Sequence, residues 1–447
     1  MSTLTTAIII VFVLGYLCIA LESFTKINKA AIALLMFVFC WTIFMINPGA
    51  YVTGLAGMDL FNEVTRHLEH HLGETSTTLF FLMGAMTIVE IVDQNGGFNF
   101  VRRVLNTTSK RSLLWRIAII TFVLSSVLDN LTTSIVMVMV LRKLVKERAD
   151  RLIYASAIVI DANAGGAFSP IGDVTTIMLW NSRMVTAIGV IAEIFLPSVV
   201  AMVIPTLIMQ YMLHGKLDET SITPIDEENE FTRRERHTIF ILGVGGLMFV
   251  PVFHSVTHLP PFVGILLVLG LLWLMSEVFY GNKSKQASKT KRVTRLLSRI
   301  DMSTILFFLG ILMAVSCLQE IGVLHDLGRW LDGVSGGNHY MVTGSIGVLS
   351  SIVDNVPLVA GCMGMYPVAP TGDMAVDGIF WQLLAYCAGV GGSILIIGSA
   401  AGVVVMGLEK ITFGWYLKRV SLVALAGYLA GMGTYWLWRT FVMTPPV

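Results

Sequence analysis

The chain has 447 residues, of which 55% are hydrophobic and 13% carry a charge. Charged residues make up roughly 25% of an ordinary soluble domain, so this composition excludes a soluble enzyme or a soluble binding module. The formal net charge of +1 is uninformative by itself. No nucleic-acid partner is expected. Uncharged runs of about 20 residues recur, each long enough to cross a hydrocarbon core of ~30 Å. We therefore predict an all-α polytopic membrane protein.

Hydropathy predicts about ten transmembrane helices in this chain. They are placed at residues 4–21, 30–47, 77–95, 152–180, 188–213, 237–256, 260–279, 303–320, 380–407 and 420–438. Two further apolar regions, 112–147 and 339–370, allow more than one assignment.

The two ambiguous regions share the motif Ser-Ser-x-x-Asp-Asn, at residues 125–130 and again at residues 350–355. An ionisable residue in the middle of a membrane segment is costly, so Asp129 and Asp354 are predicted to be functional. Each region could be one spanning helix, or a re-entrant hairpin that turns back at the Asp-Asn pair. In a hairpin, each arm around Asp129 would have about 15 residues and would reach only the middle of the bilayer.

The distribution of lysine and arginine decides between these topologies, because basic residues concentrate in cytoplasmic loops. With two re-entrant hairpins, 26 of the 30 basic residues lie on the cytoplasmic side, and only Arg66, Arg183, Arg329 and Arg439 lie outside. With two simple spans, the split becomes 12 inside and 18 outside. The hairpin topology is therefore favoured, and it places both termini on the external side.

The same topology contains an internal repeat. Residues 78–84 (TLFFLMG) resemble residues 304–310 (TILFFLG), and each segment begins a span, a hairpin and a further span. One hairpin enters from inside and the other from outside, so the repeats are inverted, which is typical of secondary transporters with broken helices and a midplane site.

The chain is accordingly divided into four regions. Residues 1–76 form the N-terminal scaffold spans with an interfacial segment, and residues 77–213 form repeat one with its cytoplasmic-side hairpin (112–147). Residues 214–302 form cytoplasmic loops with connecting spans, and residues 303–438 form repeat two with its external-side hairpin (339–370).

A hairpin tip offers unsatisfied carbonyl groups from its first arm and unsatisfied N–H groups from its second arm. Asn130 and Asn355 are suited to cap the second arms, and Pro357 suits a first helical turn. Ser125 and Ser350 precede the two aspartates by four residues, so each serine is expected on the same helix face as its aspartate. Carbonyl, hydroxyl, amide and carboxylate oxygens that meet at mid-membrane favour a hard cation.

A second broken element is predicted at residues 161–176. The pair Gly165-Gly166 and Pro170 lie within one long span and favour an unwound middle. Such backbone is tolerated at membrane depth only where it is buried in protein or lines a cavity. A simple kink, with its polar side chains satisfied by neighbouring helices, is the alternative. The polar residues around this break are Asp161, Asn163, Asp173, Thr175 and Thr176.

Repeat two has the same glycine pair, at residues 391–392, but its broken segment has lost the carboxylates. The hydroxyls that remain there belong to Ser393 and Ser399. A hard cation needs formal negative charge and several oxygens, so the tighter cation site is predicted in repeat one. Asp354 and Asn355 would then contribute a proton-handling group or a weaker site.

Buried carboxylates make ion exchange physically natural. An ionised carboxylate without a partner is costly in the membrane, so it binds a proton, and a metal cation provides the same neutralisation. Proton and cation then compete for one site. If the site can reorient across the membrane only when it is neutral, it exchanges the cation for the proton.

The two hairpin motifs, together with Asp161-Ala162-Asn163 and residues 172–176 (GDVTT), resemble those of the NhaD-type sodium/proton antiporters, members of a broader ion-transporter fold. The resemblance covers essentially the whole chain. It implies exchange of Na⁺, often also Li⁺, for H⁺, without a cofactor. It also implies a homodimer in the lipid bilayer, in which each chain has a scaffold domain and a transport domain. We expect the membrane to be the bacterial inner membrane. The site residues that the resemblance implies are Ser125, Asp129, Asn130, Asn163, Asp173, Thr175, Thr176, Ser350, Asp354 and Asn355. Na⁺ itself is expected at Asp129, Asn130, Asn163, Asp173 and Thr175.

Two other functions are weighed against this expectation. The same fold includes dicarboxylate and arsenite carriers, but an anionic substrate would be repelled by Asp129 and Asp354. An intramembrane aspartyl protease needs two carboxyl groups about 3 Å apart that share a proton, and the chain lacks a Gly-x-Gly-Asp sequence.

Residues 66–74 are expected to form an external interfacial helix, whose His67, His70 and His71 could bind a metal or sense pH.

Overall fold

The computed structural model describes residues 3–20, 27–52, 54–55, 57–97, 104–105, 107–217, 232–281, 296–352 and 354–443. Within these ranges every regular element is a helix, so the predicted all-α class is confirmed. The basic linker 283–295 and residues Lys26, Arg102 and Arg103, which entered the charge count, lie outside the described residues. The helices are α1 (Thr3–Ala20), α3 (Lys29–Ile46), α4 (Met58–Gln94), α6 (Lys110–Ser125), α7 (Asn130–Leu144), α8 (Arg148–Ala167), α9 (Val174–Asn181), α10 (Ala187–Met209), α11 (Arg233–Thr257), α12 (Pro261–Gly281), α15 (Met302–Glu320), α16 (Val323–Ser335), α17 (His339–Leu349), α18 (Asn355–Met365), α19 (Ile379–Gly391), α20 (Ala400–Glu409), α21 (Phe413–Arg419) and α22 (Ser421–Phe441), with short 3-10 turns η1 (Pro48–Ala50), η2 (Gln210–Met212) and η4 (Leu297–Arg299).

Each of the ten predicted spans corresponds to a helix or to a pair of helices separated by a break, but the span 77–95 is only the second half of α4. This helix begins at Met58, so segment 66–74, expected as a separate interfacial helix, is continuous with that span. Six helices in the described ranges are long and apolar enough to cross a membrane alone, namely α3, α4, α10 with η2, α11, α12 and α15. A seventh span forms if α21 and α22, which are bent by 54°, are taken together. The spans predicted at 152–180 and 380–407 are interrupted, as α8 with α9 and as α19 with α20. These two are the broken helices.

Both Ser-Ser-x-x-Asp-Asn motifs interrupt their helices, as the hairpin topology requires. α6 has 16 residues and α7 has 15, so each arm is only about 24 Å long, too short to cross ~30 Å of hydrocarbon. The ends of each hairpin also lie together. Lys110 Nζ is 3.4 Å from Glu147 Oε2 across the base of hairpin one (α6 and α7), and His339 Nδ1 is 2.9 Å from Asp373 Oδ2 across the base of hairpin two (α17 and α18).

The capping prediction at the hairpin tips was wrong by one residue. The N-caps of α7 and α18 are Asp129 and Asp354, whose carboxylates accept backbone N–H groups from the first turn, and Asn130 and Asn355 are the first helical residues. A carboxylate is favoured at this position because it satisfies an orphan N–H group and also interacts with the positive end of the helix dipole. The shared helix face predicted for Ser125 and Asp129 is also wrong, because α6 ends at Ser125.

The two repeats use the same contacts to join each hairpin to its broken helix. Ser125 Oγ donates to the Ala162 carbonyl at 2.6 Å, and Ser350 Oγ donates to the Ala388 carbonyl at 2.9 Å. Close to these bonds, Gly165 lies against the backbone of α6, and a Cβ atom at this position would collide with it. Gly391 lies in the same way against the backbone of α17. The glycine pairs therefore provide close helix packing, and the chain unwinds just after them.

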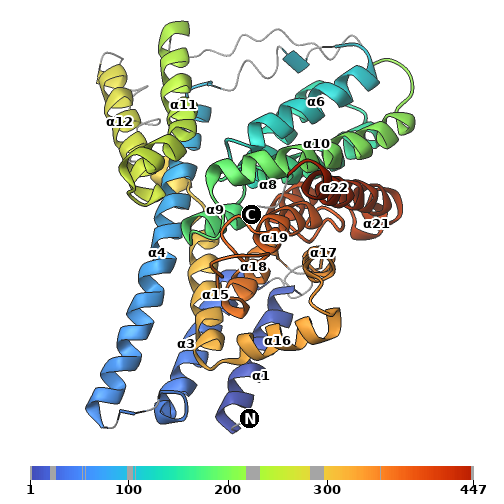
Figure 1. Ribbon diagram of the computed structural model, residues 1–447. Coiled ribbons are helices and arrows are strands. Elements are labelled where there is room, and N and C mark those ends of the chain that lie inside the picture. Colours follow the sequence, from blue (N-terminus) through green and yellow to red (C-terminus); the bar gives the residue numbers. More distant parts are fainter. Residues whose placement is uncertain are drawn as a thin grey trace.

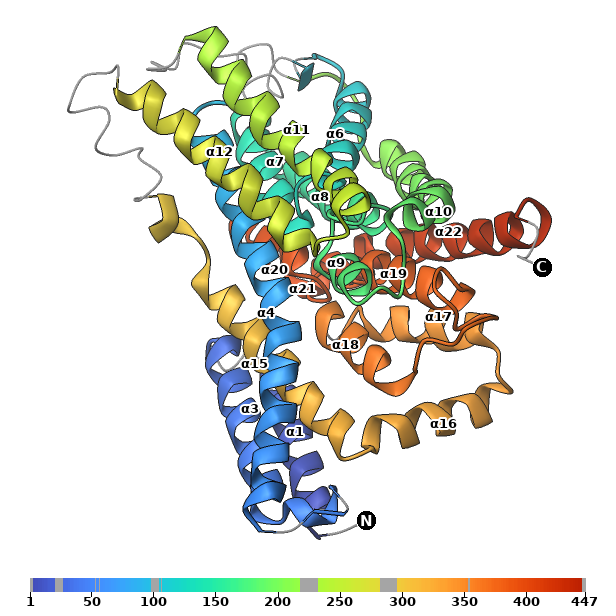
Figure 2. The ribbon, with the colours of Figure 1, turned by 60° about the vertical axis from the view of Figure 1, so that its left-hand side comes forward.

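Figures 1 and 2 show the helices in two groups. One group contains α1, α3, α4, α11, α12 and α15, and the other contains α6 to α10 with α17 to α22, while α16 contacts α15 of the first group and α17 and α18 of the second. In the first group, Trp41 Nε1 donates to the Met313 carbonyl at 2.8 Å and joins α3 to α15. In the second, the buried Glu409 carboxylate of α20 accepts from Arg142 Nε at 2.6 Å and Arg151 Nε at 2.7 Å, which joins both hairpin one and α8 to repeat two. Both hairpin tips lie where the two groups meet.

Candidate functional site

Four polar side chains predicted from separate parts of the chain meet in one hydrogen-bonded network. Asn130 Nδ2 donates to Asn163 Oδ1 at 3.0 Å and to Asp173 Oδ2 at 2.7 Å. Asn163 Nδ2 donates to Ser399 Oγ at 3.0 Å. All four side chains are buried. The network therefore connects the tip of hairpin one to the breaks of both broken helices.

Local helix chemistry explains why these residues converge. Asp173 is the N-cap of α9 and Ser399 is the N-cap of α20, both with extended backbone, while Asn130 opens α7. Each break thus ends with a polar side chain that accepts a hydrogen bond from the new helix. The caps of α9 and α20 and the first residue of α7 therefore form one polar cluster inside apolar helices.

Asp173 has the largest number of contacts in this cluster. Its Oδ1 atom accepts from the Thr175 N–H group at 2.9 Å and from Thr175 Oγ1 at 2.8 Å, while Oδ2 accepts from Asn130. Three donors hold the carboxylate in one orientation. The carboxylate, the Asn163 amide and the Thr175 hydroxyl are left with oxygen lone pairs in the same small volume.

Asp129 lies at the edge of the cluster rather than inside the network. Its Oδ1 atom accepts from the Thr132 N–H group at 2.8 Å, and Oδ2 accepts from Thr132 Oγ1 at 2.5 Å. A cavity of about 40 Å³ adjoins it, lined by residues of hairpin one, α4, α9, α15 and α20, Asp129 and Asn130 among them. This is room for about one water molecule or a small ion. Thr132 was not predicted, although its spacing of three residues from Asp129 is that of a capping partner.

The other predicted hydroxyl groups bind backbone carbonyls and do not enter the network. Ser393 Oγ donates to the Val390 carbonyl at 2.6 Å, and Thr176 Oγ1 to the Ala167 carbonyl at 3.4 Å. Ser125 and Ser350 hold the hairpins in the same manner, as described above. These four residues support the bends of the chain.

Asp161 is buried but stands apart from the network. It precedes Asn163 by two residues, so the two side chains leave α8 on nearly opposite faces. Its side chain is 1% exposed, and neither carboxylate oxygen has a hydrogen-bond partner in the part of the chain that the structure describes. The structure therefore separates Asp161 from the residues with which it was grouped.

Repeat two presents its tip carboxylate differently. Asp354 Oδ2 accepts from Lys29 Nζ at 2.9 Å, and Asn355 is buried next to it. By contrast, no lysine or arginine nitrogen within the described ranges pairs with Asp129, Asp161 or Asp173. Lys29 was counted only as a loop charge, because its position at the start of an apolar run does not identify a partner 325 residues away.

The predicted histidine cluster joins α4 to the end of α15. His67 Nδ1 lies 2.9 Å from Glu320 Oε2, and His71 Nε2 lies 2.8 Å from Glu320 Oε1. His70 is exposed and lies 3.4 Å from Glu74 Oε1. Among the described residues, no three histidine, cysteine or acidic side chains are placed to hold a metal. The geometry is that of a bridging carboxylate between two helices.

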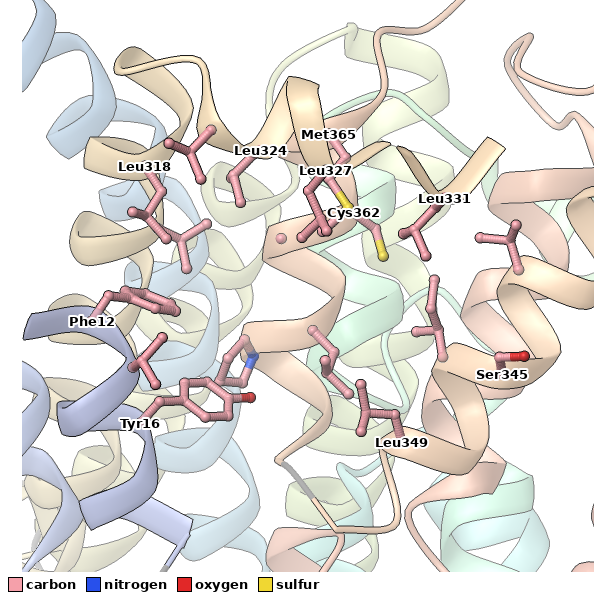
Figure 3. A pocket seen from close by; sticks show the side chains of 18 of the residues that line it. Phe12, Tyr16, Leu318, Leu324, Leu327, Leu331, Ser345, Leu349, Cys362 and Met365 are labelled. Carbon is pink, nitrogen blue, oxygen red and sulfur yellow. The ribbon is translucent and has the colours of Figure 1, made fainter. Parts of the chain in front are cut away.

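A larger cavity lies away from the polar network. It has a volume of about 640 Å³ and is bounded by α1, α15, α16 and hairpin two. Figure 3 shows that Phe12, Leu318, Leu327 and Leu349 point into it and that its lining is almost entirely apolar. Such a lining offers few oxygen ligands to a cation, whereas the cavity of about 40 Å³ adjoins Asp129 and Asn130.

These features, inverted repeats with two re-entrant hairpins and two broken helices around buried polar caps, define a membrane transporter. Comparison with known proteins agrees. The profile of the citrate transporter family matches residues 16–385 of the chain. The crystal structure of the YdaH transporter of Alcanivorax borkumensis has a similar fold, with a TM-score of 0.61 over 93% of this chain and 100% of that one, at 16% sequence identity.

The relatives define the family more closely. Sodium/proton antiporter 1 of Arabidopsis thaliana is 44% identical over 96% of this chain and 72% of its own length, and sodium/proton antiporter 2 is 42% identical over 95% and 98%. The Na⁺/H⁺ antiporter NhaD of Vibrio cholerae is 30% identical over 96% of this chain and 91% of its own length. The chain belongs to the NhaD-type sodium/proton antiporter family, as its motifs predicted.

Proposed function

We propose that this protein is a secondary transporter that exchanges Na⁺, and also Li⁺, for H⁺ across the membrane. The single observation that carries the proposal is the buried network of Asn130, Asn163 and Asp173, in which no basic side chain of the described residues neutralises the carboxylate. Oxygen ligands with formal negative charge suit a small hard cation. The relatives named sodium/proton antiporters support the choice of ions.

The geometry of the network supports the proposed set of ligands. Na⁺ binds at the carboxylates of Asp129 and Asp173, the amide oxygens of Asn130 and Asn163, and the hydroxyl of Thr175. Asp173 and Thr175 are already in contact, and Asn163 is linked to Asp173 through Asn130, whose Nδ2 atom donates to both side chains. The cavity beside Asp129 supplies the remaining space.

Exchange follows from competition for the same charge. A proton on a site carboxylate neutralises it as a bound cation does, so the two ions exclude each other. The helix breaks give the site its own hinge elements, and inverted repeats allow it to open to each side of the membrane in turn. Each opening then releases one ion and accepts the other.

A direct test uses the purified protein in liposomes that contain a pH-sensitive dye. Addition of Na⁺ or Li⁺ outside should move protons, and K⁺ is added in a parallel measurement as the comparison cation. A Na⁺ pulse that leaves the internal pH unchanged, in protein that is folded and correctly inserted, would refute the proposal.

The family profile carries the name of a citrate transporter, so an anion is the second candidate. Helix N-termini are positive and would attract an anion if their caps were neutral. Here Asp129 and Asp173 occupy two of those N-termini without a basic partner among the described residues, and they reverse the local charge there. We therefore expect no flux of labelled citrate or arsenite in the same liposomes.

The proposal also covers topology and assembly, with both termini external, a bacterial inner membrane location, and a homodimer. The ion pairs at the bases of the two hairpins support the re-entrant topology. The oligomeric state is measured by size-exclusion chromatography with light scattering in detergent. A mass of one chain per particle at all concentrations would refute the dimer.

A further inference from the structure

The hairpin-two carboxylate already has a cation. Lys29 Nζ lies 2.9 Å from Asp354 Oδ2, and the two side chains are only 24% and 16% exposed. A pair with so little exposure is weakly screened by solvent and salt. The Asp354 carboxylate also accepts a longer hydrogen bond of 3.3 Å, from the Val356 N–H group to Oδ1.

Among the residues that the structure describes, none with a positive charge pairs with the equivalent carboxylate of repeat one, Asp129. Asp129 and Asp354 have the same place in the repeated motif and both cap the second arm of a hairpin. The donors to Asp129, however, are the N–H and hydroxyl groups of Thr132, which are neutral. The two tips therefore differ by one full positive charge at the carboxylate.

Several contacts hold Lys29 in this position. It is the first residue of α3, and the preceding Asn28 caps the helix by accepting from the Ala30 N–H group at 2.8 Å. Asn28 Nδ2 also donates to Ser303 Oγ at 2.8 Å, which fixes the end of α3 beside α15. The Lys29 ammonium lies 4.2 Å from the centre of the Phe307 ring, a favourable cation–π distance.

We propose that Lys29 is a built-in cation that occupies the carboxylate of hairpin two and limits the protein to one sodium site per chain. This rests on the proposed function of the repeat-one site. An ammonium group and a sodium ion carry the same charge and bind the same oxygens, so one excludes the other. Because Lys29 is tethered, its effective concentration at Asp354 is high and does not fall with the salt concentration outside.

Sodium binding per chain tests the proposal directly. Purified protein is titrated with radioactive ²²Na⁺ in detergent, and the bound ions are counted by scintillation proximity. Wild-type protein should bind one sodium ion. Lys29→Met should bind two, because Asp354 is then a free carboxylate beside Asn355. Lys29→Arg keeps the charge and should bind one.

Two further variants locate the second ion. The double variant Lys29→Met with Asp354→Asn should return to one bound sodium, since the freed carboxylate is gone. Lys110→Met is the matched control: Lys110 Nζ lies 2.5 Å from Asp150 Oδ2, in another lysine–aspartate pair, at the opposite end of α6 from the tip of hairpin one. That variant should still bind one.

Each result has a defined meaning. One sodium ion in both wild type and Lys29→Met, or two in wild type, overturns the role of Lys29 while the repeat-one site stands. No sodium in wild type refutes the proposed function itself. If Lys29→Met does not fold, Lys29→Gln replaces it, and Asp354→Asn in the wild-type background decides independently. That variant should keep one bound sodium, and its loss would show that Asp354 is itself a ligand.

Discussion

Asp173 combines two tasks in one side chain. Its Oδ1 atom completes the first turn of α9 through Thr175, and its Oδ2 atom binds Asn130 of hairpin one. Because the same carboxylate contacts both helices, a movement of hairpin one also changes the cap of α9. A cation that binds Asp173 therefore changes the contact between α9 and hairpin one, which links ion binding to the breaks of the helices.

The first prediction concerns this carboxylate. Asp173→Asn keeps the size of the side chain but removes its charge. Hydrogen bonds to charged groups contribute about 1.5–3 kcal/mol, so we expect the apparent sodium constant to rise by about ten- to hundredfold, or transport to be lost. It is measured as sodium-driven proton flux in liposomes.

Asp161→Asn is the comparison variant, since it makes the same chemical change two residues from Asn163 but outside the network. We expect a clearly smaller rise of the sodium constant. An equal or larger effect of Asp161→Asn would mean that the network is not the sodium site.

The second prediction separates two serines of the same broken segment. Ser399 Oγ accepts from Asn163, whereas Ser393 Oγ donates to the Val390 carbonyl within its own turn. Ser399→Ala should raise the apparent sodium constant several-fold, because the loss of one buried hydrogen bond costs about 1 kcal/mol. Ser393→Ala should change it less. The opposite order, in flux measurements at matched expression, would exclude Ser399 as the support of Asn163.

At the scale of elements, the site is an assembly of helix N-termini. α7, α9, α18 and α20 each begin with a polar cap, and three of the four caps are aspartates. The pattern could be partly predicted, because the two Ser-Ser-x-x-Asp-Asn motifs and the glycine pairs mark the breaks. The exact cap could not, because Asp and Asn are both good N-caps and a spacing of one residue does not distinguish them.

The third prediction concerns the packing of hairpin one on α8. Gly165 lies so close to the Phe122 carbonyl that a Cβ atom would overlap the backbone, which cannot move as a flexible side chain could. Gly165→Ala should therefore destabilise the protein by about 1–3 kcal/mol, seen as a lower melting temperature in detergent. Gly270→Ala in α12 is the control, since nothing lies within 4 Å of its added Cβ atom. Equal melting temperatures for the two variants would show that the close approach does not contribute to stability.

At the scale of the whole molecule, the sequence predicted the elements well but not every contact between the two groups of helices. Ten apolar segments, two hairpins and the inverted repeats follow from hydropathy, charge and motif spacing, which are local signals. The Lys29–Asp354 pair and the Asn163–Ser399 bond join residues 325 and 236 positions apart. One sequence carries no local signal for such pairs, because each partner is an ordinary polar residue at the end of a helix.

The last prediction concerns the topology of the whole chain. Lys110 and Glu147 pair at the base of hairpin one, and His339 and Asp373 pair at the base of hairpin two, so each hairpin begins and ends in one place. Single cysteines at positions 110 and 146 should therefore label from one side of the membrane, and those at 338 and 373 from the other. The background must first lose the native residues Cys18, Cys40, Cys317, Cys362 and Cys387.

An impermeant maleimide on intact cells, compared with permeabilised cells, distinguishes the sides. The excess of lysine and arginine around hairpin one places positions 110 and 146 in the cytoplasm, where only permeabilised cells should label. Positions 338 and 373 should label in intact cells. Labelling of 110 and 146 from opposite sides would mean that region 112–147 crosses the membrane, and the two repeats could then no longer be inverted. Labelling of all four positions from one side would keep both hairpins but would remove the inversion on which exchange between the two sides depends.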